Sequence, residues 1–293
     1  MTPPEAFHLR IDSLLPAEIA EKAEQVGAQK TRLDGITLLT LAVLGGAFIA
    51  LGGMFATTVL AGAEDLPFGV GRLLAGLVFC LGIILVVAGG AELFTGNTLM
   101  VIACVSQCVR LREMLRAWFI VYVGNFVGGV GTALLVFLAG QHLSGQGEVA
   151  AAALGIARTK ILLPFDRALF LGVLCNVLVC LAIWLSYGAR TTSDKVLAVL
   201  FPVSAFVAAG FEHSVANMYF IPLALFIVEW APDSLWQQMG GSAADYAALT
   251  WGRFVVSLVP VTIGNIIGGG LLVGGVYWFV YRRKRLAAGT REG

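Results

Sequence analysis

One histidine lies within an apolar stretch of this sequence, in the run Gly210-Phe211-Glu212-His213-Ser214-Val215-Ala216-Asn217. Placing an ionisable side chain at membrane depth costs about 2.5–3.5 kcal/mol, so such a residue indicates a functional site. An imidazole can donate a hydrogen bond to an anion and can exchange a proton near neutral pH. We therefore predict that His213 takes part in moving an anion or a proton. The alternative is a histidine satisfied within the protein core.

A second run, Gly89-Gly90-Ala91-Glu92-Leu93-Phe94-Thr95-Gly96-Asn97, aligns with the first at a constant offset of 120 residues. The offset pairs Glu92 with Glu212 and Asn97 with Asn217. Because a bare carboxylate would repel an anion, we interpret both glutamates as structural groups that tie irregular backbone together; a proton relay is the alternative. The asparagines could cap helices or offer amide donors. The hydroxyl of Thr95 could bond both His213 and a passing oxyanion, or cap a helix.

The composition indicates that a lipid bilayer is the solvent for most of the chain. Hydrophobic residues make up 58% of the 293 residues and charged residues 13%, against about 25% charged in average soluble domains. We read six apolar stretches from the sequence. Their approximate bounds are 36–60, 72–106, 117–140, 168–188, 196–229 and 254–281. The formal net charge of +1 suggests no nucleic-acid partner.

The second and fifth stretches are too long for a simple span, since a membrane helix needs about 20 residues. Each carries glycines and polar groups midway, so we expect two broken helices, which are tolerated where protein or a water-filled cavity satisfies the freed backbone. A further match joins Gly124-Asn125 to Gly264-Asn265. Three spans per half would enter the membrane in opposite senses. We therefore predict an all-α membrane protein built as an inverted 3+3 repeat, approximately 36–140 and 168–281.

The positive residues predict the orientation. On this reading 14 of the 19 Lys and Arg residues lie in the N-terminal segment, the loops after the second and fourth spans, and the C-terminal tail. Both termini are then cytoplasmic. We expect an amphipathic cytoplasmic segment over 1–35, a pore domain over 36–281 and a basic cytoplasmic tail over 282–293. The five cysteines show no spacing typical of disulfides or metal ligands, and no metal or cofactor is expected.

Together, the runs quoted above and Val261-Thr262-Ile263-Gly264-Asn265-Ile266-Ile267-Gly268-Gly269-Gly270 resemble the formate/nitrite transporter family over nearly the whole chain. Asp12-Ser13-Leu14-Leu15-Pro16 and Pro260-Val261-Thr262 are most similar to its formate channels. The resemblance implies an aquaporin-like fold, a homopentamer with one pore per subunit, and an inner-membrane location. Gly96-Asn97 resembles some nitrite-type members more, which keeps nitrite and hydrosulfide as alternative substrates.

The resemblance also assigns roles to individual residues. His213 would be the central pore histidine, and Thr95 would lie in a loop that rearranges. Leu93 and Ile83 would line a slit on the cytoplasmic side, Phe79 and Phe206 a constriction on the opposite side, and Lys160 and Asn176 an anion vestibule. From the residues alone, Phe79, Phe94 and Phe206 could form hydrophobic constrictions or simply pack, and Lys160 could focus anions or be a solvated loop charge.

The function that these patterns favour is passive or proton-coupled passage of formate and similar small monovalent anions. A neutral-solute channel is disfavoured because no Asn-Pro-Ala pair occurs, and an ammonium channel because no second pore histidine occurs. A membrane enzyme is disfavoured because catalysis would want a second activated group. We therefore expect a transport protein that is not an enzyme, with a small anion and membrane lipid as its partners.

Overall fold

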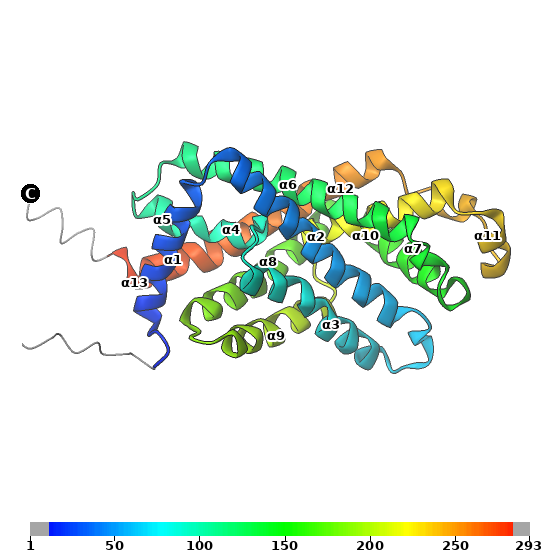
Figure 1. Cartoon of the computed structure of the whole chain (residues 1–293), viewed down its shortest axis with the longest axis horizontal. Coiled ribbons are helices and arrows are strands. Elements are labelled where there is room, and N and C mark those ends of the chain that lie inside the picture. Colours follow the sequence, from blue (N-terminus) through cyan, green and yellow to red (C-terminus); the bar gives the residue numbers. More distant parts are fainter. Residues whose placement is uncertain (1–11, 284–293) are drawn as a thin grey trace, which may run out of the picture.

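The computed structural model describes residues 12–283, and every regular element in that range is a helix. In chain order the helices are α1 Pro16–Thr31, α2 Gly35–Leu60, α3 Phe68–Gly89, α4 Phe94–Asn97, α5 Val101–Val105, α6 Leu111–Leu138, α7 Glu148–Ile161, α8 Phe165–Gly188, α9 Thr192–Ala208, α10 Ser214–Trp230, α11 Asp233–Met239, α12 Trp251–Asn265 and α13 Val276–Tyr281 (Figure 1). A π-helical segment, Ile266–Gly275, joins α12 to α13 without a break.

Membrane-spanning length is reached by five helical segments in the described part of the chain. They are α2, α3, α6, α8 and the segment from Ala243 to Tyr281 that contains α12 and α13, and a sixth span is reached if the bent pair α10 and α11 is counted as one. The all-helical membrane class predicted from the sequence is therefore confirmed, with five to six spans by length and apolar composition.

Both overlong apolar stretches are interrupted in the structure. Helix α3 ends at Gly89 and helix resumes at Phe94; α9 ends at Ala208 and α10 begins at Ser214. Gly90 and Gly210 have φ angles of 82° and 74°, a left-handed conformation that a side chain with a Cβ would strain. The matched glycines therefore end the first half of each broken helix.

The core is centred on α10, in which every residue from Ser214 to Ile227 is buried. The helices around α10 approach one another closely because glycines lie where they cross. A Cβ on Gly46 would collide with the Asn125 backbone, and one on Gly128 with the Val43 carbonyl, so α2 and α6 pack backbone to backbone. Gly264 and Gly268 make the corresponding approach to α8. Small residues have this role in membrane helix pairs generally.

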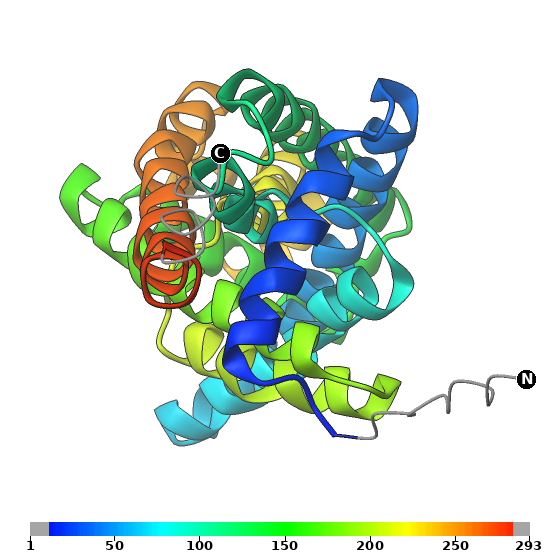
Figure 2. The ribbon, with the colours of Figure 1, turned by 90° about the vertical axis from the view of Figure 1, so that its left-hand side faces the viewer.

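Two helices lie outside the bundle of spans, at opposite ends of the molecule. The N-terminal helix α1 crosses one end, beside α5 and α13, as the end-on view shows (Figure 2). Helix α7 lies toward the other end (Figure 1). The sequence suggested the amphipathic α1, whereas the segment that forms α7 was interpreted as a loop. The predicted segment 1–35 and tail 282–293 are described only from residue 12 and up to residue 283.

Candidate functional site

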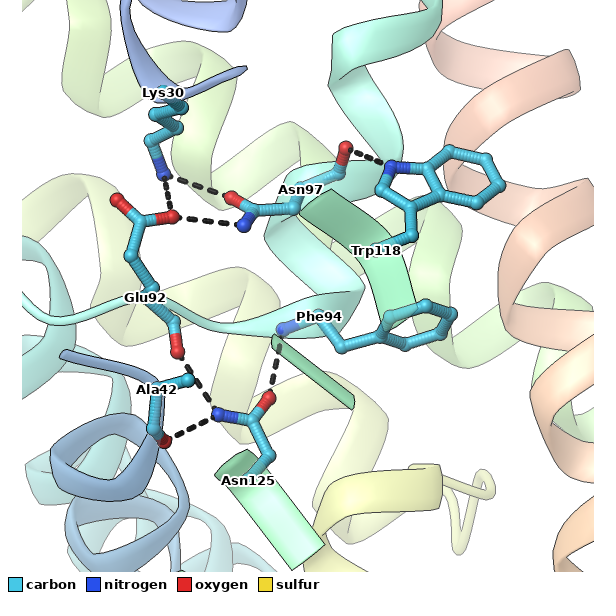
Figure 3. A network of polar contacts seen from close by, with 7 residues as sticks. All are labelled: Lys30, Ala42, Glu92, Phe94, Asn97, Trp118 and Asn125. Carbon is cyan, nitrogen blue, oxygen red and sulfur yellow. Dashed lines mark hydrogen bonds and ion pairs between the residues drawn. The ribbon is translucent and has the colours of Figure 1, made fainter. Parts of the chain in front are cut away.

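Two asparagines from neighbouring helices hold the two breaks in the same way. The Asn125 Nδ2 atom donates to the carbonyl oxygens of Ala42 (2.7 Å) and Glu92 (2.9 Å), and its Oδ1 atom accepts from the Phe94 N–H (2.8 Å) (Figure 3). Backbone groups freed by breaking a helix are costly when buried. One fully buried amide side chain therefore satisfies a carbonyl and an N–H of the first break and joins them to α2.

Asn265 repeats these contacts at the second break. Its Nδ2 atom donates to Gly172 O (2.8 Å) and Glu212 O (3.0 Å), and its Oδ1 atom accepts from the Ser214 N–H (2.9 Å). The first N–H of each second half is thus used within the protein. The N–H groups of Phe94 and Ser214 are therefore not available to a passing solute.

A lysine, a glutamate and an asparagine form a buried polar group beside the first break. The Lys30 Nζ atom, from the last turn of α1, donates to Glu92 Oε2 (3.0 Å) and Asn97 Oδ1 (2.8 Å) (Figure 3). The Asn97 Nδ2 atom donates to the same glutamate oxygen at 2.7 Å. Trp118 Nε1 in turn bonds Asn97 O at 2.9 Å. A buried carboxylate is tolerated because a cation and an amide both bond it.

The second break carries the matching group, with one bond fewer. Lys160, in the last turn of α7, donates to Glu212 Oε1 (2.8 Å), and Asn217 Nδ2 donates to Glu212 Oε2 (2.7 Å). The Asn217 Oδ1 atom is buried and has no partner, whereas Asn97 Oδ1 bonds Lys30. Each glutamate is thus bonded by a side-chain amide and by a lysine, whose charge balances that of the carboxylate.

Thr95 and His213 meet between the breaks. The distance from Thr95 Oγ1 to His213 Nε2 is 3.0 Å, and both side chains are buried. The His213 Nδ1 atom accepts from the Ala216 N–H at 3.0 Å, so this imidazole caps α10. Because a neutral ring carries one proton, an Nδ1 acceptor places that proton on Nε2, from which it is donated to Thr95. The threonine hydroxyl proton is then free for another acceptor.

Two cavities lie close to this pair: one reaches His213, and the other reaches Gly96, the residue after Thr95. The first, of about 260 Å³, is lined by residues of α2, α3, α7, α9, α10 and the second break, which include Phe79, Lys160, Phe206, Glu212 and His213; we call it the His213 cavity. The second, of about 190 Å³, is lined by Lys30, Glu92, Leu93, Gly96, Asn97 and neighbours on α3 and α8; we call it the Lys30 cavity. Thr95 therefore links the two cavities: it bonds His213, which lines the first, and precedes Gly96, which lines the second.

The remaining predicted residues line neither of these cavities. Ile83 is fully buried in α3. The Phe94 ring packs edge-on against Trp118 and Tyr122, with centroid distances of 6.0 and 4.9 Å. The Asn176 Nδ2 atom donates to Thr95 O (3.1 Å) and Asn265 O (2.6 Å), which places this amide behind Thr95.

Sequence reasoning missed four residues of this region: Lys30, Arg72, Asn125 and Asn265. The two asparagines occupied matched positions inside apolar stretches, and a buried amide at a matched position is a signal of a structural role. Lys30 lay in the predicted amphipathic helix but had no indicated partner. Arg72 lines the His213 cavity, and its Nε atom donates to Ala208 O at the end of α9 (3.2 Å).

Comparison with known proteins now decides the family. Residues 17–279 match the model of the family described as formate/nitrite transporter. The chain belongs to the formate/nitrite transporter family. It is 40% identical over 274 residues to formate channel FocA of Escherichia coli (strain K12), covering 93% of this chain and 96% of that protein.

Two solved structures share the fold. One, described as a pentameric formate channel with formate bound, has a TM-score of 0.81 and 41% identity, covering 84% of this chain and 97% of its own. Another, described as an FNT family ion channel, has a TM-score of 0.76 and 30% identity, covering 90% and 98%. The resemblance drawn from the sequence motifs is thereby confirmed. The chain is a membrane protein of a transport family and not an enzyme.

Proposed function

We propose that this protein is an inner-membrane channel that moves formate and similar small monovalent anions, passively or coupled to protons. One observation carries the proposal: one cavity reaches His213 from the end that carries α7, another reaches Gly96, next to Thr95, from the end that carries α1, and a partly buried lysine lines each. The related formate channels support formate as the substrate, and the pentameric neighbour supports a homopentamer with one pore per subunit.

We also propose six spans, two of them broken, arranged as an aquaporin-like inverted 3+3 repeat over about 36–140 and 168–281. The matched contacts of Asn125 and Asn265 support this arrangement, since each joins a break to two neighbouring helices by the same three bonds. The distribution of lysine and arginine supports cytoplasmic N- and C-termini. On that orientation the Lys30 cavity opens to the cytoplasm.

An anion entering a dry passage loses hydration worth many kcal/mol, and fixed dipoles or charges must replace it. The lysines supply the first replacement at each entrance, although each is already paired with a glutamate, so an anion meets a polar group with little net charge. Deeper in the passage, the free hydroxyl proton of Thr95 is the donor available to a carboxylate. The His213 Nε2–H orients that hydroxyl by donating to its oxygen.

Apolar side chains on both sides of this pair disfavour hydrated ions. Phe79 and Phe206 pack edge to face in the His213 cavity with ring centroids 5.7 Å apart, and Leu93 lines the Lys30 cavity. Hydrophobic constrictions of this kind exclude hydrated ions. A formate ion that takes up a proton crosses them as neutral formic acid, which removes most of the desolvation cost. The pH on each side then sets the direction of net flux.

Flux of labelled formate into proteoliposomes that contain the purified protein tests the proposal. Formate should enter well above the rate of protein-free liposomes, and acetate, with its extra methyl group, should enter more slowly. Competition with nitrite and hydrosulfide tests the alternative substrates that Gly96-Asn97 keeps open. Formate flux equal to that of protein-free liposomes would overturn the proposed function.

A further inference from the structure

A third cavity lies apart from the proposed passage, where the end of α1 meets the loop before α6. Its volume is about 650 Å³, and it shares no lining residue with the His213 or Lys30 cavities. Among its lining residues are Arg32, Arg110, Glu113 and Arg116, and we call it the arginine cavity. Nothing in the proposed transport mechanism uses it.

The arginine cavity carries uncompensated positive charge. Its single lining carboxylate, Glu113, is held by the Arg110 backbone N–H at 2.9 Å, at the start of α6. Within residues 12–283 the ion pairs involve Lys30, Lys160 and Arg282, and none involves the three arginines of this cavity. Three guanidinium groups around one space repel one another unless an anion joins them, and their forked donors match phosphate oxygens.

The surface next to the cavity is apolar and exposed. On α6, Leu111, Leu115 and Phe119 recur every four residues and so share one face, with exposed fractions of 59%, 49% and 71%. Ile36, at the start of α2, is 81% exposed. A basic cavity that borders an apolar helix face at the end of a membrane span has the chemistry of a site for a charged headgroup and its acyl chains.

We propose that the arginine cavity binds the phosphate headgroup of an anionic phospholipid, whose acyl chains lie along Leu111, Leu115 and Phe119. The bound phosphate bridges Arg32, at the end of α1, to Arg110 and Arg116, at the start of α6. Because Arg32 follows Lys30 by two residues, the lipid also fixes the end of the helix that supplies Lys30 to Glu92 and Asn97. This site is independent of the transported anion.

The test uses the full-length assembled protein in nanodiscs of neutral phosphatidylcholine, titrated with phosphatidylglycerol and followed by native mass spectrometry of the retained lipid. The double variant Arg32→Gln/Arg116→Gln removes two cavity charges. The matched control, Arg112→Gln/Arg190→Gln, removes two exposed arginines that do not line the cavity and has the same net charge. Removing two charges near the headgroup should weaken phosphatidylglycerol binding roughly thirty-fold, and the control should change it less than about threefold.

A charge-retaining variant, Arg32→Lys/Arg116→Lys, keeps the proposal testable if the glutamine variant fails to assemble; it should retain binding within about tenfold of the unmodified protein. Equal weakening in the cavity and control variants would overturn the site, as would binding that all variants retain unchanged. Inorganic phosphate is a separate arm. If millimolar phosphate alone displaces the lipid, the cavity belongs to a soluble phosphate and the lipid assignment is wrong.

Discussion

The imidazole of His213 has two neighbours that together define its hydrogen-bonding state. Its Nδ1 atom accepts from the Ala216 N–H, and its Nε2 atom faces Thr95. Protonating Nδ1 would turn an acceptor into a second donor opposite that N–H, so α10 would lose its cap. The geometry therefore favours a neutral ring that orients Thr95. A proton passed through His213 would have to disturb the start of α10.

Replacing His213 by phenylalanine removes the donor to Thr95 and keeps an aromatic ring in the site. We expect formate flux at pH 7 to fall about 10- to 100-fold, the effect of losing a hydrogen bond that serves a charged group. Flux at pH 5 should fall less, because more formic acid is then present and needs no such donor. The measurement is formate flux in proteoliposomes between pH 5 and 8, in parallel with the unmodified protein.

The control for this variant is His142→Gln, since His142 is buried between α6 and α7 and lines no cavity of the passage. Its pH profile should match that of the unmodified protein. An unaltered profile in His213→Phe would contradict the proposed role of the imidazole.

Within residues 12–283 Arg72 forms no ion pair, whereas Lys160, the other cation that lines the His213 cavity, is paired with Glu212. We expect Arg72→Gln to raise the half-saturating formate concentration about three- to tenfold on the side of that cavity, with little change in maximal flux, because a focusing charge acts on arrival. Arg158→Gln, an exposed cation on α7 outside the cavity, is the control. The difference should shrink in high salt; the same loss in both variants would argue against a specific role for Arg72.

At the scale of the elements, the crossing of α2 and α6 depends on glycines with no room for a methyl group. A Cβ on Gly128 would collide with the Val43 carbonyl, which belongs to rigid helix backbone. We expect Gly128→Ala to lower stability by about 1–3 kcal/mol, the usual cost of overpacking. Thermal unfolding of the detergent-solubilised protein measures this change.

Gly131, on the same helix, has open space where a methyl group would stand, with no atom of a neighbouring element within 4 Å, so Gly131→Ala serves as the matched control. It should be neutral or slightly stabilising, because alanine favours helix over glycine. If the two alanine variants unfold at the same temperature, the close approach of α2 and α6 does not limit stability.

The sequence allowed both breaks to be predicted, because Gly90 and Gly210 stand with polar residues in the middle of overlong apolar stretches. It did not allow the partners of the breaks to be predicted. Lys30 is 62 residues from Glu92, and Lys160 is 52 residues from Glu212. Such pairings depend on how separate helices dock, which local periodicity does not encode. Helix α7 was missed because its 14 residues are too short for a membrane span, so the segment between the third and fourth spans was interpreted as a loop.

At the scale of the whole molecule, the end of α13 is bonded to α1, although the two lie far apart in the sequence. Arg282 donates to Glu24 through Nε (3.0 Å) and Nη2 (2.8 Å). Burial raises the pKa of the Glu24 carboxyl, but the hydrogen bonds and positive charge of Arg282 outweigh that effect and leave its pKa below the ordinary value. The pair therefore stabilises α1 docking above the ordinary carboxylate pKa, and this contribution is lost as the pH falls through the lowered value.

Replacing Glu24 by glutamine removes the charge that Arg282 binds. We expect the α1 amides to exchange with solvent about tenfold faster at neutral pH, since a hydrogen bond to a charged group is lost. Gln25→Ala, at the exposed neighbouring position, should leave exchange unchanged. Hydrogen–deuterium exchange measured by mass spectrometry resolves the α1 peptides. Equal protection of α1 in Glu24→Gln and in the unmodified protein would show that the pair does not hold the helix.

Because Lys30 makes one hydrogen bond more than Lys160, the two entrances of the proposed passage differ. Lys30 holds both Glu92 and Asn97, whereas Lys160 holds Glu212 and leaves the oxygen of Asn217 unused. An anion that enters beside α7 has to displace fewer hydrogen bonds of the lysine it meets than an anion that enters beside α1. With equal concentrations and pH on either side, the unidirectional rates must still balance, but the concentration that half-saturates entry can differ between the two faces. Half-maximal entry should therefore differ between the faces, and replacing Asn97 by alanine should bring the two values together.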